Sequence, residues 1–190
     1  LTVLGLNPLL TGFALLTALI LDAISDPLIG TFSDRIRSKF GRRHLLMAFS
    51  LFPISLSYLM LFLPEPDWAE NQIFLFMWLL IFAVITRFSA TLFDIPHRAL
   101  AAEIPESYED KASIMSLREG FQSLIALSHS FIILPFINLD GNDQWFNVGI
   151  IGSFIMFVLG LISIIGTKSL IPNLYQWPET KENNNPFKEI

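Results

Sequence analysis

The sequence predicts an all-α membrane protein with five transmembrane helices, and three observations support that prediction. First, 53% of the 190 residues are hydrophobic and only 15% are charged, whereas soluble domains carry roughly 25% charged residues. Second, the charged residues are confined to short intervals between long uncharged stretches. Third, Lys and Arg concentrate in alternate intervals, as they do in the loops of membrane proteins that stay in the cytoplasm.

The composition also excludes several classes of protein. There is no cysteine, which excludes disulfide scaffolds, thiolate metal sites and cysteine nucleophiles. The net charge of −5 argues against a nucleic-acid partner, because such proteins bind through a basic surface. The sequence holds neither a Ser/His pair at useful spacing nor an HExxH motif, so we expect no enzymatic activity, no catalytic residues and no cofactor.

Five stretches can form membrane-spanning helices, which need about 20 mainly apolar residues each. The stretches without Asp, Glu, Lys or Arg are residues 1–21, 45–64, 71–86, 120–139 and 144–167. The third is short, and we expect its helix to continue through Arg87 with polar residues inside the membrane. The predicted helices therefore cover about 9–32, 44–63, 72–98, 113–136 and 145–168. The last one carries glycines that favour close helix packing, namely Gly149, Gly152, Gly160 and Gly166.

The basic residues set the expected orientation of these helices. Loop 33–43 holds five Arg and Lys residues, whereas the charged residues of segments 64–71 and 137–144 are all acidic. Because positively charged loops stay in the cytoplasm, the first helix should enter from the outside and the chain should end inside. The chain begins with an outside loop and without an initiator Met. We therefore interpret it as a fragment that lacks a preceding helix.

Two carboxylates lie in the first predicted helix. Asp22 and Asp26 are four residues apart and hence on one helix face. An ionised Asp near the bilayer centre costs at least about 2.5–3.5 kcal/mol. We therefore expect both side chains to face a bundle interior or water, with a cation or a basic partner. For Asp26 an alternative is a helix-start role beside Pro27.

The third predicted helix repeats this pattern of polar residues inside the membrane. Arg87, Thr91, Asp94 and Arg98 fall on one helical stripe. Either these side chains line an interior cavity, or they form a salt-bridged stripe whose arginines reach the cytoplasmic interface. Arg118, near the start of the next helix, is either part of the same site or an interface anchor.

The connection between the first two predicted helices carries a specific motif. Gly30 precedes the pair Asp34-Arg35, and Gly41-Arg42 follows. This pattern resembles the loop signature of the major facilitator superfamily, which links the second and third helices of that fold. In that family the Asp pairs with neighbouring helix ends and helps to gate the inner side. The resemblance implies that Gly30, Asp34, Arg35, Gly41 and Arg42 form a gating loop.

Further motifs narrow the resemblance to one branch of that superfamily. The segments 22–27, 94–96 and 116–118 occur in the right order and resemble the glycoside–pentoside–hexuronide:cation symporters, the melibiose-permease family. The resemblance implies that the five helices are helices two to six of a twelve-helix fold. Residues 1–170 would be a partial N-terminal six-helix bundle, and residues 171–190 would be the cytoplasmic loop between the two halves.

The resemblance also implies a function. This family couples the transport of a sugar to Na⁺, H⁺ or Li⁺ by alternating access, so we expect a multi-pass symporter of the bacterial inner (plasma) membrane. The expected partners are a sugar or uronide, a monovalent cation, the lipid bilayer and the missing C-terminal half of the chain. Two alternatives are a lysophospholipid-type symporter of the same superfamily and a non-transporting membrane receptor or scaffold that kept the fold.

The same resemblance assigns the cation ligands. Asp22 and Asp26 would bind the coupling ion, Na⁺ or H⁺, with Ser25 and Thr91 supplying neutral oxygens. The chemistry of these side chains supports the same assignment, because clustered carboxylates and hydroxyls are the hard oxygen ligands that suit a small hard cation. A cation between the two carboxylates would also relieve their mutual repulsion.

On the substrate side the sequence departs from the melibiose permeases. The resemblance implies that Asp94 and Arg118 hold sugar hydroxyls and link the two sites. Where those permeases carry an aromatic residue that stacks on the sugar, this sequence has His97-Arg98. Arg87, Arg98 and Arg118 together would suit an anionic sugar, because guanidinium binds carboxylate through two hydrogen bonds. We therefore predict that a uronide is preferred over a neutral sugar.

Overall fold

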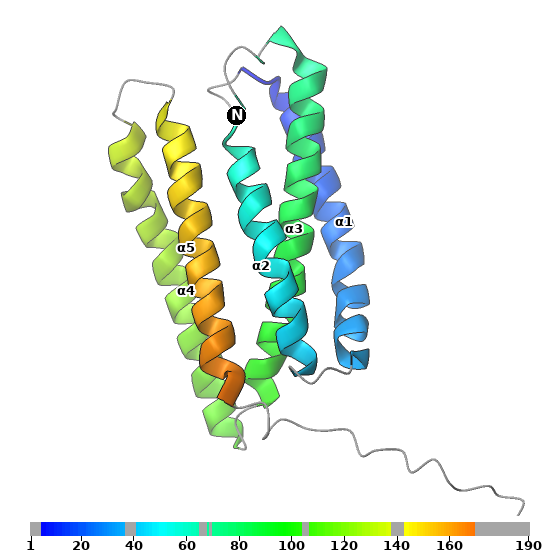
Figure 1. The fold of residues 1–190 in the computed structure, drawn as a ribbon, viewed down its shortest axis with the longest axis vertical. Helices are drawn as coiled ribbons and strands as arrows, with labels where there is room; N and C mark the ends of the chain where they lie inside the picture. The colour runs from blue at the N-terminus through cyan, green and yellow to red at the C-terminus, as the bar shows by residue number, and fades with distance from the viewer. Residues whose placement is uncertain are drawn as a thin grey trace, which may run out of the picture.

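Five α-helices make up most of the part of the chain that the computed structural model describes, residues 5–36, 41–64, 68, 70–103, 107–137 and 143–169. They are α1 (Pro8–Arg35), α2 (Arg42–Leu61), α3 (Gln72–Glu103), α4 (Tyr108–Ile137) and α5 (Asp143–Thr167). Successive helices alternate in direction and lie side by side along the long axis of the molecule (Figure 1). The predicted all-α fold is confirmed. The predicted inter-half loop, residues 171–190, lies outside the described residues.

Local sequence signals set where the first two helices begin. The Asn7 side chain accepts a hydrogen bond from the backbone N–H of Leu9 at 2.9 Å, which caps α1. Gly41 precedes α2 with a φ of 87°, a left-handed conformation that favours glycine. α1 continues without a break through Pro27. The alternative that Asp26 marks a helix start is therefore wrong.

α3 and α4 extend further than the sequence predicted, to Glu103 and from Tyr108. The predicted limits followed the charged residues, whereas α3 continues past Arg98 through the apolar residues 99–102, and α4 begins in polar sequence ahead of its apolar part. At the start of α4, the Ser107 hydroxyl accepts a hydrogen bond from the backbone N–H of Asp110 at 3.0 Å and donates one to the Asp110 carboxylate at 2.7 Å. This reciprocal cap begins the helix ahead of its apolar part.

α3 occupies the centre of the helix packing. It packs against both α1 and α2, and α2 in turn packs against α5. α4 lies beside α5 (Figure 1) and touches α3 and α5 over a smaller area. Apolar clusters fix α1 against α3 at both ends, one around Ala14 and Leu79 and the other around Ile29 and Leu92.

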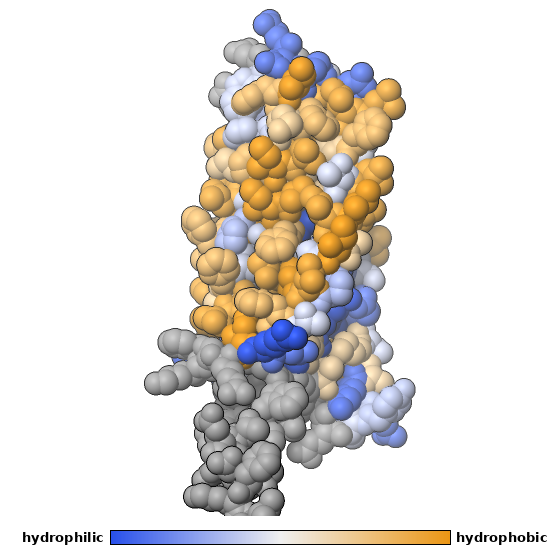
Figure 2. Space-filling view, turned by 90° about the vertical axis from the view of Figure 1, so that its right-hand side faces the viewer, coloured by the Kyte–Doolittle hydropathy of each residue, from blue (hydrophilic) through white to orange (hydrophobic). Residues whose placement is uncertain are grey.

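The surface of the bundle suits a membrane. Among the described residues, four helices are long and apolar enough to cross one: α1, α2, α3 and α5. α4 is 30 residues long and runs alongside α5, and its residues 120–137 carry no Asp, Glu, Lys or Arg. Figure 2 shows a broad hydrophobic band between hydrophilic ends on the face that carries α1. Exposed Leu and Phe side chains form this band, as expected where lipid chains are the solvent.

Glycines let α5 approach α2 closely, as the sequence predicted for three of the four positions. A Cβ atom added at Gly149 would lie 2.7 Å from Cβ of Phe62, and one at Gly160 would lie 2.2 Å from a methyl of Leu51. Gly152 meets the ring of a tyrosine in the same way. Side chains of α2 thus fill the space that the missing side chains of α5 leave.

We predict that Gly149→Ala destabilises the protein relative to Gly166→Ala by about 1–3 kcal/mol, the usual cost of overpacking. Phe62 cannot rotate its Cβ away from the new methyl, whereas nothing lies within 4 Å of the position a Cβ would take at Gly166. Both changes raise helix propensity equally, so their difference isolates the packing term. Denaturant unfolding of the two variants in detergent measures it. Equal midpoints would contradict the packing described here.

Candidate functional site

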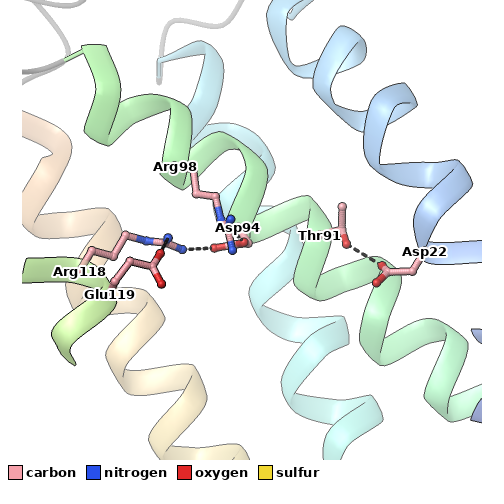
Figure 3. A network of polar contacts seen from close by, with 6 residues as sticks. All are labelled: Asp22, Thr91, Asp94, Arg98, Arg118 and Glu119. Carbon is pink, nitrogen blue, oxygen red and sulfur yellow. Dashed lines mark hydrogen bonds and ion pairs between the residues drawn. The ribbon is translucent and has the colours of Figure 1, made fainter. Parts of the chain in front are cut away.

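A polar contact joins α1 to α3 inside the apolar bundle. Asp22, near the midpoint of α1, accepts a hydrogen bond at Oδ1 from the Thr91 hydroxyl at 2.8 Å. Its Oδ2 accepts one from Nη1 of Arg87 at 3.2 Å. The Asp22 side chain is 19% exposed. Figure 3 shows Asp22 reaching across to Thr91 of α3. Of the partners expected for Asp22, a cation or a basic residue, the structure supplies a basic one, Arg87.

A second polar contact joins α3 to α4. Asp94 Oδ2 accepts a hydrogen bond from Nε of Arg98 at 2.6 Å, within α3. Asp94 Oδ1 accepts one from Nη2 of Arg118, which comes from α4, at 2.5 Å. Arg118 also donates to Glu119 at 3.2 Å and is 16% exposed (Figure 3). Arg118 thus pairs with Asp94 across the α3–α4 contact, as the alternative of a shared site expects.

The two contacts form one network because α3 contributes to both. Thr91 and Asp94 lie about one turn apart on α3, so the carboxylate of Asp22 and that of Asp94 are held by neighbouring parts of one helix (Figure 3). The network contains three guanidinium groups and three carboxylates. They are Arg87, Arg98, Arg118, Asp22, Asp94 and Glu119.

This pairing corrects one step of the sequence analysis. There, Arg87, Arg98 and Arg118 together are expected to suit an anionic sugar, which requires a surplus of positive charge in the site. Arg87 instead pairs with Asp22, and Arg118 has Glu119 as a second partner. The reason is geometric, since α1 packs on the side of α3 that carries Arg87.

Two predicted cation ligands lie outside this hydrogen-bonded network. The Ser25 hydroxyl donates to the backbone carbonyl of Asp22 at 3.0 Å, and Ser25 lines an apolar pocket between α1, α2 and α3 with Leu28 and Leu92. Asp26 is exposed, and within the described part of the chain it has no hydrogen bond or ion pair. Among the predicted cation ligands, Asp22 and Thr91 are therefore the pair whose side chains are hydrogen-bonded to each other.

The side-chain donors that meet at Asp22 and Thr91 are a carboxylate and a hydroxyl oxygen. Carboxylate and hydroxyl oxygens are hard ligands. Over the described residues, no group of three His, Asp or Glu side chains lies close enough to hold a metal ion. Any ion bound at Asp22 would depend on one or two carboxylates and on neutral oxygens.

The predicted gating loop is held by a residue that the sequence analysis did not assign to it. Asp34, at the end of α1, pairs with Nη2 of Arg43 at 3.6 Å, and Arg43 is 8% exposed. Gly30 lies within α1, and Arg35 is exposed at its last position. The side chain of Arg42 lies outside the described set.

Helical spacing could have identified Arg43. It lies three residues before Leu46 and seven before Ser50, and all three are buried on one face of α2. The next residue, His44, was also missed. Its Nε2 lies 3.0 Å from the Thr167 hydroxyl, and this contact joins the start of α2 to the end of α5.

The chain is similar to membrane transporters over nearly its full length. The model of the MFS/sugar transport protein family matches residues 1–188. The uncharacterized symporter sll1374 of Synechocystis sp. is 34% identical over 120 residues, which are 62% of this chain and 22% of that protein. The uncharacterized symporter YnaJ of Bacillus subtilis is 30% identical over 164 residues, 84% of this chain and 34% of that protein. The putative glycoside/cation symporter YagG of Escherichia coli is 26% identical over 167 residues, 86% of this chain and 34% of that protein.

The chain spans about a third or less of the length of these curated relatives. The five helices therefore correspond to only a part of each of these relatives. The name symporter belongs to these relatives as whole proteins.

We predict that Arg118→Gln lowers the free energy of unfolding more than Arg98→Gln does. Arg118 is 16% exposed and bridges two helices, so losing its charged hydrogen bonds should cost about 1.5–3 kcal/mol. Arg98 is 53% exposed and pairs within one helix, a type of pair that contributes about 0.3–0.5 kcal/mol. Denaturant unfolding of both variants measures the difference. An equal or larger loss with Arg98→Gln would show that the α3–α4 bridge does not stabilise the bundle.

Proposed function

Because the chain belongs to the MFS/sugar transport protein family, we propose that the whole protein is a symporter that couples sugar uptake to a cation gradient by alternating access. The chain is an integral, multi-pass protein of the bacterial inner membrane. Symporter is the name that its relatives carry, and one of them is a putative glycoside/cation symporter. These names support both halves of the proposal, the sugar and the coupling ion.

The interior carboxylate of Asp22 is the observation that carries this proposal. It lies near the midpoint of an apolar helix, where an ionised group is costly. A hydroxyl group and a guanidinium group, both from α3, donate hydrogen bonds to this carboxylate. A charge retained at that cost is expected to serve an ion or substrate pathway.

In the proposed mechanism the cation binds at Asp22. Thr91 supplies a neutral oxygen, and Ser25 and Asp26, close by on the same helix, complete the set. The substrate binds at Asp94 and at the two arginines that contact it, Arg98 and Arg118. A carboxylate accepts hydrogen bonds from sugar hydroxyls, and a guanidinium group donates hydrogen bonds to them. α3 carries groups of both sites about one turn apart, so a shift of α3 on binding one ligand changes the other site.

The proposed inner gate lies at the cytoplasmic ends of α1, α2 and α5. The Asp34–Arg43 pair joins α1 to α2, and the His44–Thr167 contact joins α2 to α5. Both contacts lie at the ends of the helices, away from the positions at which Gly149 and Gly160 pack. They can therefore break and re-form without disturbing the packing of Gly149 and Gly160 against α2.

We predict that Asp22→Asn in the whole protein abolishes cation stimulation of uptake and lowers abundance much less. The amide keeps the size of the side chain but removes the charge that would hold the ion. Uptake of a panel of radiolabelled glycosides and uronides into membrane vesicles, with and without a Na⁺ or pH gradient, measures the effect. Glu70→Gln is the matched control, because Glu70 is exposed just ahead of α3. Unchanged Na⁺ and pH dependence in Asp22→Asn would show that the assignment is wrong.

The charge of the substrate is tested separately. We predict that a labelled uronide is displaced more weakly by the matching neutral glycoside than by unlabelled uronide. The guanidinium groups of Arg98 and Arg118 pair best with a carboxylate, since charge-assisted hydrogen bonds are about twice as strong as neutral ones. Arg98→Gln should reduce the preference. If the neutral sugar competes equally and the variant leaves that ratio unchanged, the substrate is a neutral sugar.

A further inference from the structure

Both carboxylate oxygens of Asp22 already have a donor. Oδ1 receives the hydroxyl of Thr91 and Oδ2 receives Nη1 of Arg87. Arg87 and Thr91 lie four residues apart on α3, so a single face of that helix supplies both donors. The site proposed for the cation is therefore neutralised by the protein itself.

The two donors differ in what a cation would require of them. A hydroxyl donates one hydrogen bond but also has lone pairs, so Thr91 can rotate its hydrogen away and become an oxygen ligand. A guanidinium group has donors only and never accepts. It also carries a positive charge that repels a cation at the same carboxylate. Thr91 can stay when a cation binds at Asp22, whereas Arg87 must leave Oδ2.

Arg87 has room to leave. Its side chain is 46% exposed, against 19% for Asp22. A long, flexible side chain at that exposure can turn away while its aliphatic part stays on the helix. The neighbouring carboxylate on α3, Asp94, already receives Arg98 and Arg118 at its two oxygens. The released guanidinium group would therefore need another acceptor, such as the substrate.

We propose that Arg87 is a built-in counter-ion, which pairs with Asp22 while the coupling cation is absent and is displaced when the cation binds. This inference rests on the proposed function and adds a residue that sets cation affinity. The cation must compete with a tethered guanidinium group, which lowers the apparent affinity. With this counter-ion, the carboxylate of Asp22 does not stay unpaired inside the bundle when the cation is absent.

The test compares cation affinity in the whole protein and in Arg87→Gln. Purified protein is titrated with Na⁺, Li⁺ and H⁺ in turn, and binding is followed by the rise in thermal stability that a ligand of the native state produces. Removing the competing charge should tighten binding of the coupling cation at least threefold. Lys111→Gln is the control for losing one positive charge, because Lys111 is exposed in the first turn of α4. Its cation affinity should equal that of the wild type.

Arg87→Lys covers the case in which Arg87→Gln does not fold. An ammonium group keeps the charge but loses the guanidinium fork, so its cation affinity should lie between that of the wild type and that of Arg87→Gln. If Arg87→Gln is not recovered, Arg87→Lys must by itself bind the cation more tightly than the wild type. Unchanged or weaker binding overturns the counter-ion proposal.

The outcomes separate this inference from the proposed function. Tighter binding in the variants supports the counter-ion role. If the wild type binds a cation and the variants bind it no more tightly, the counter-ion role is overturned and cation coupling stands. If the wild type binds none and Arg87→Gln gains binding, Arg87 permanently replaces the cation, which supports its pairing role and overturns coupling. If neither protein binds any of the three ions, both proposals are overturned.

Discussion

The architecture depends on keeping the carboxylate of Asp22 satisfied inside an apolar bundle. A membrane interior offers no water to an ionised group, so its partners must come from another helix. Thr91 and Arg87 are those partners, and both lie on α3. This requirement favours the face of α1 that carries Asp22 for the contact with α3, which also packs against α2 and α4. The apolar residues around Ala14 and Ile29 then close the two ends of the same interface.

The helices around α3 are held by two different kinds of interface. α2 and α5 meet through close steric contacts, in which Gly149 and Gly160 receive side chains of α2. α4 meets α3 through a smaller contact area whose principal described interaction is the pair of Asp94 and Arg118. A steric interface of the first kind resists displacement, because close-packed atoms have few alternative arrangements. An ionic interface can exchange its partner for a ligand of the same charge. Movement on substrate binding should therefore occur between α3 and α4.

The sequence predicted the helices well because the membrane imposes a simple pattern, in which long uncharged stretches cross and charged intervals do not. It also predicted that Asp22 needs an interior partner, since the energetic cost follows from its position alone. The identity of that partner depends on the rotation of α1 relative to α3, which no spacing within one helix reveals. For the same reason Arg87 was grouped with Asp94, and Arg43 was counted only as a cytoplasmic positive charge.

The charge balance of the network constrains what can bind to it. Three guanidinium groups face three carboxylates, so the network is neutral before any ligand arrives. While the displaced guanidinium group of Arg87 stays in the site, a cation at Asp22 adds one positive charge in a medium of low dielectric constant, where an unbalanced charge is far more costly than in water. Two negative groups can balance it: Asp26, one helical turn from Asp22 and without a partner among the described residues, or a carboxylate on the substrate. If Asp26 turns toward the cation, a neutral sugar completes the complex. If it stays turned away, the sugar must bring the negative charge. The orientation of Asp26 and the charge of the transported sugar are thus linked by a single electrostatic balance.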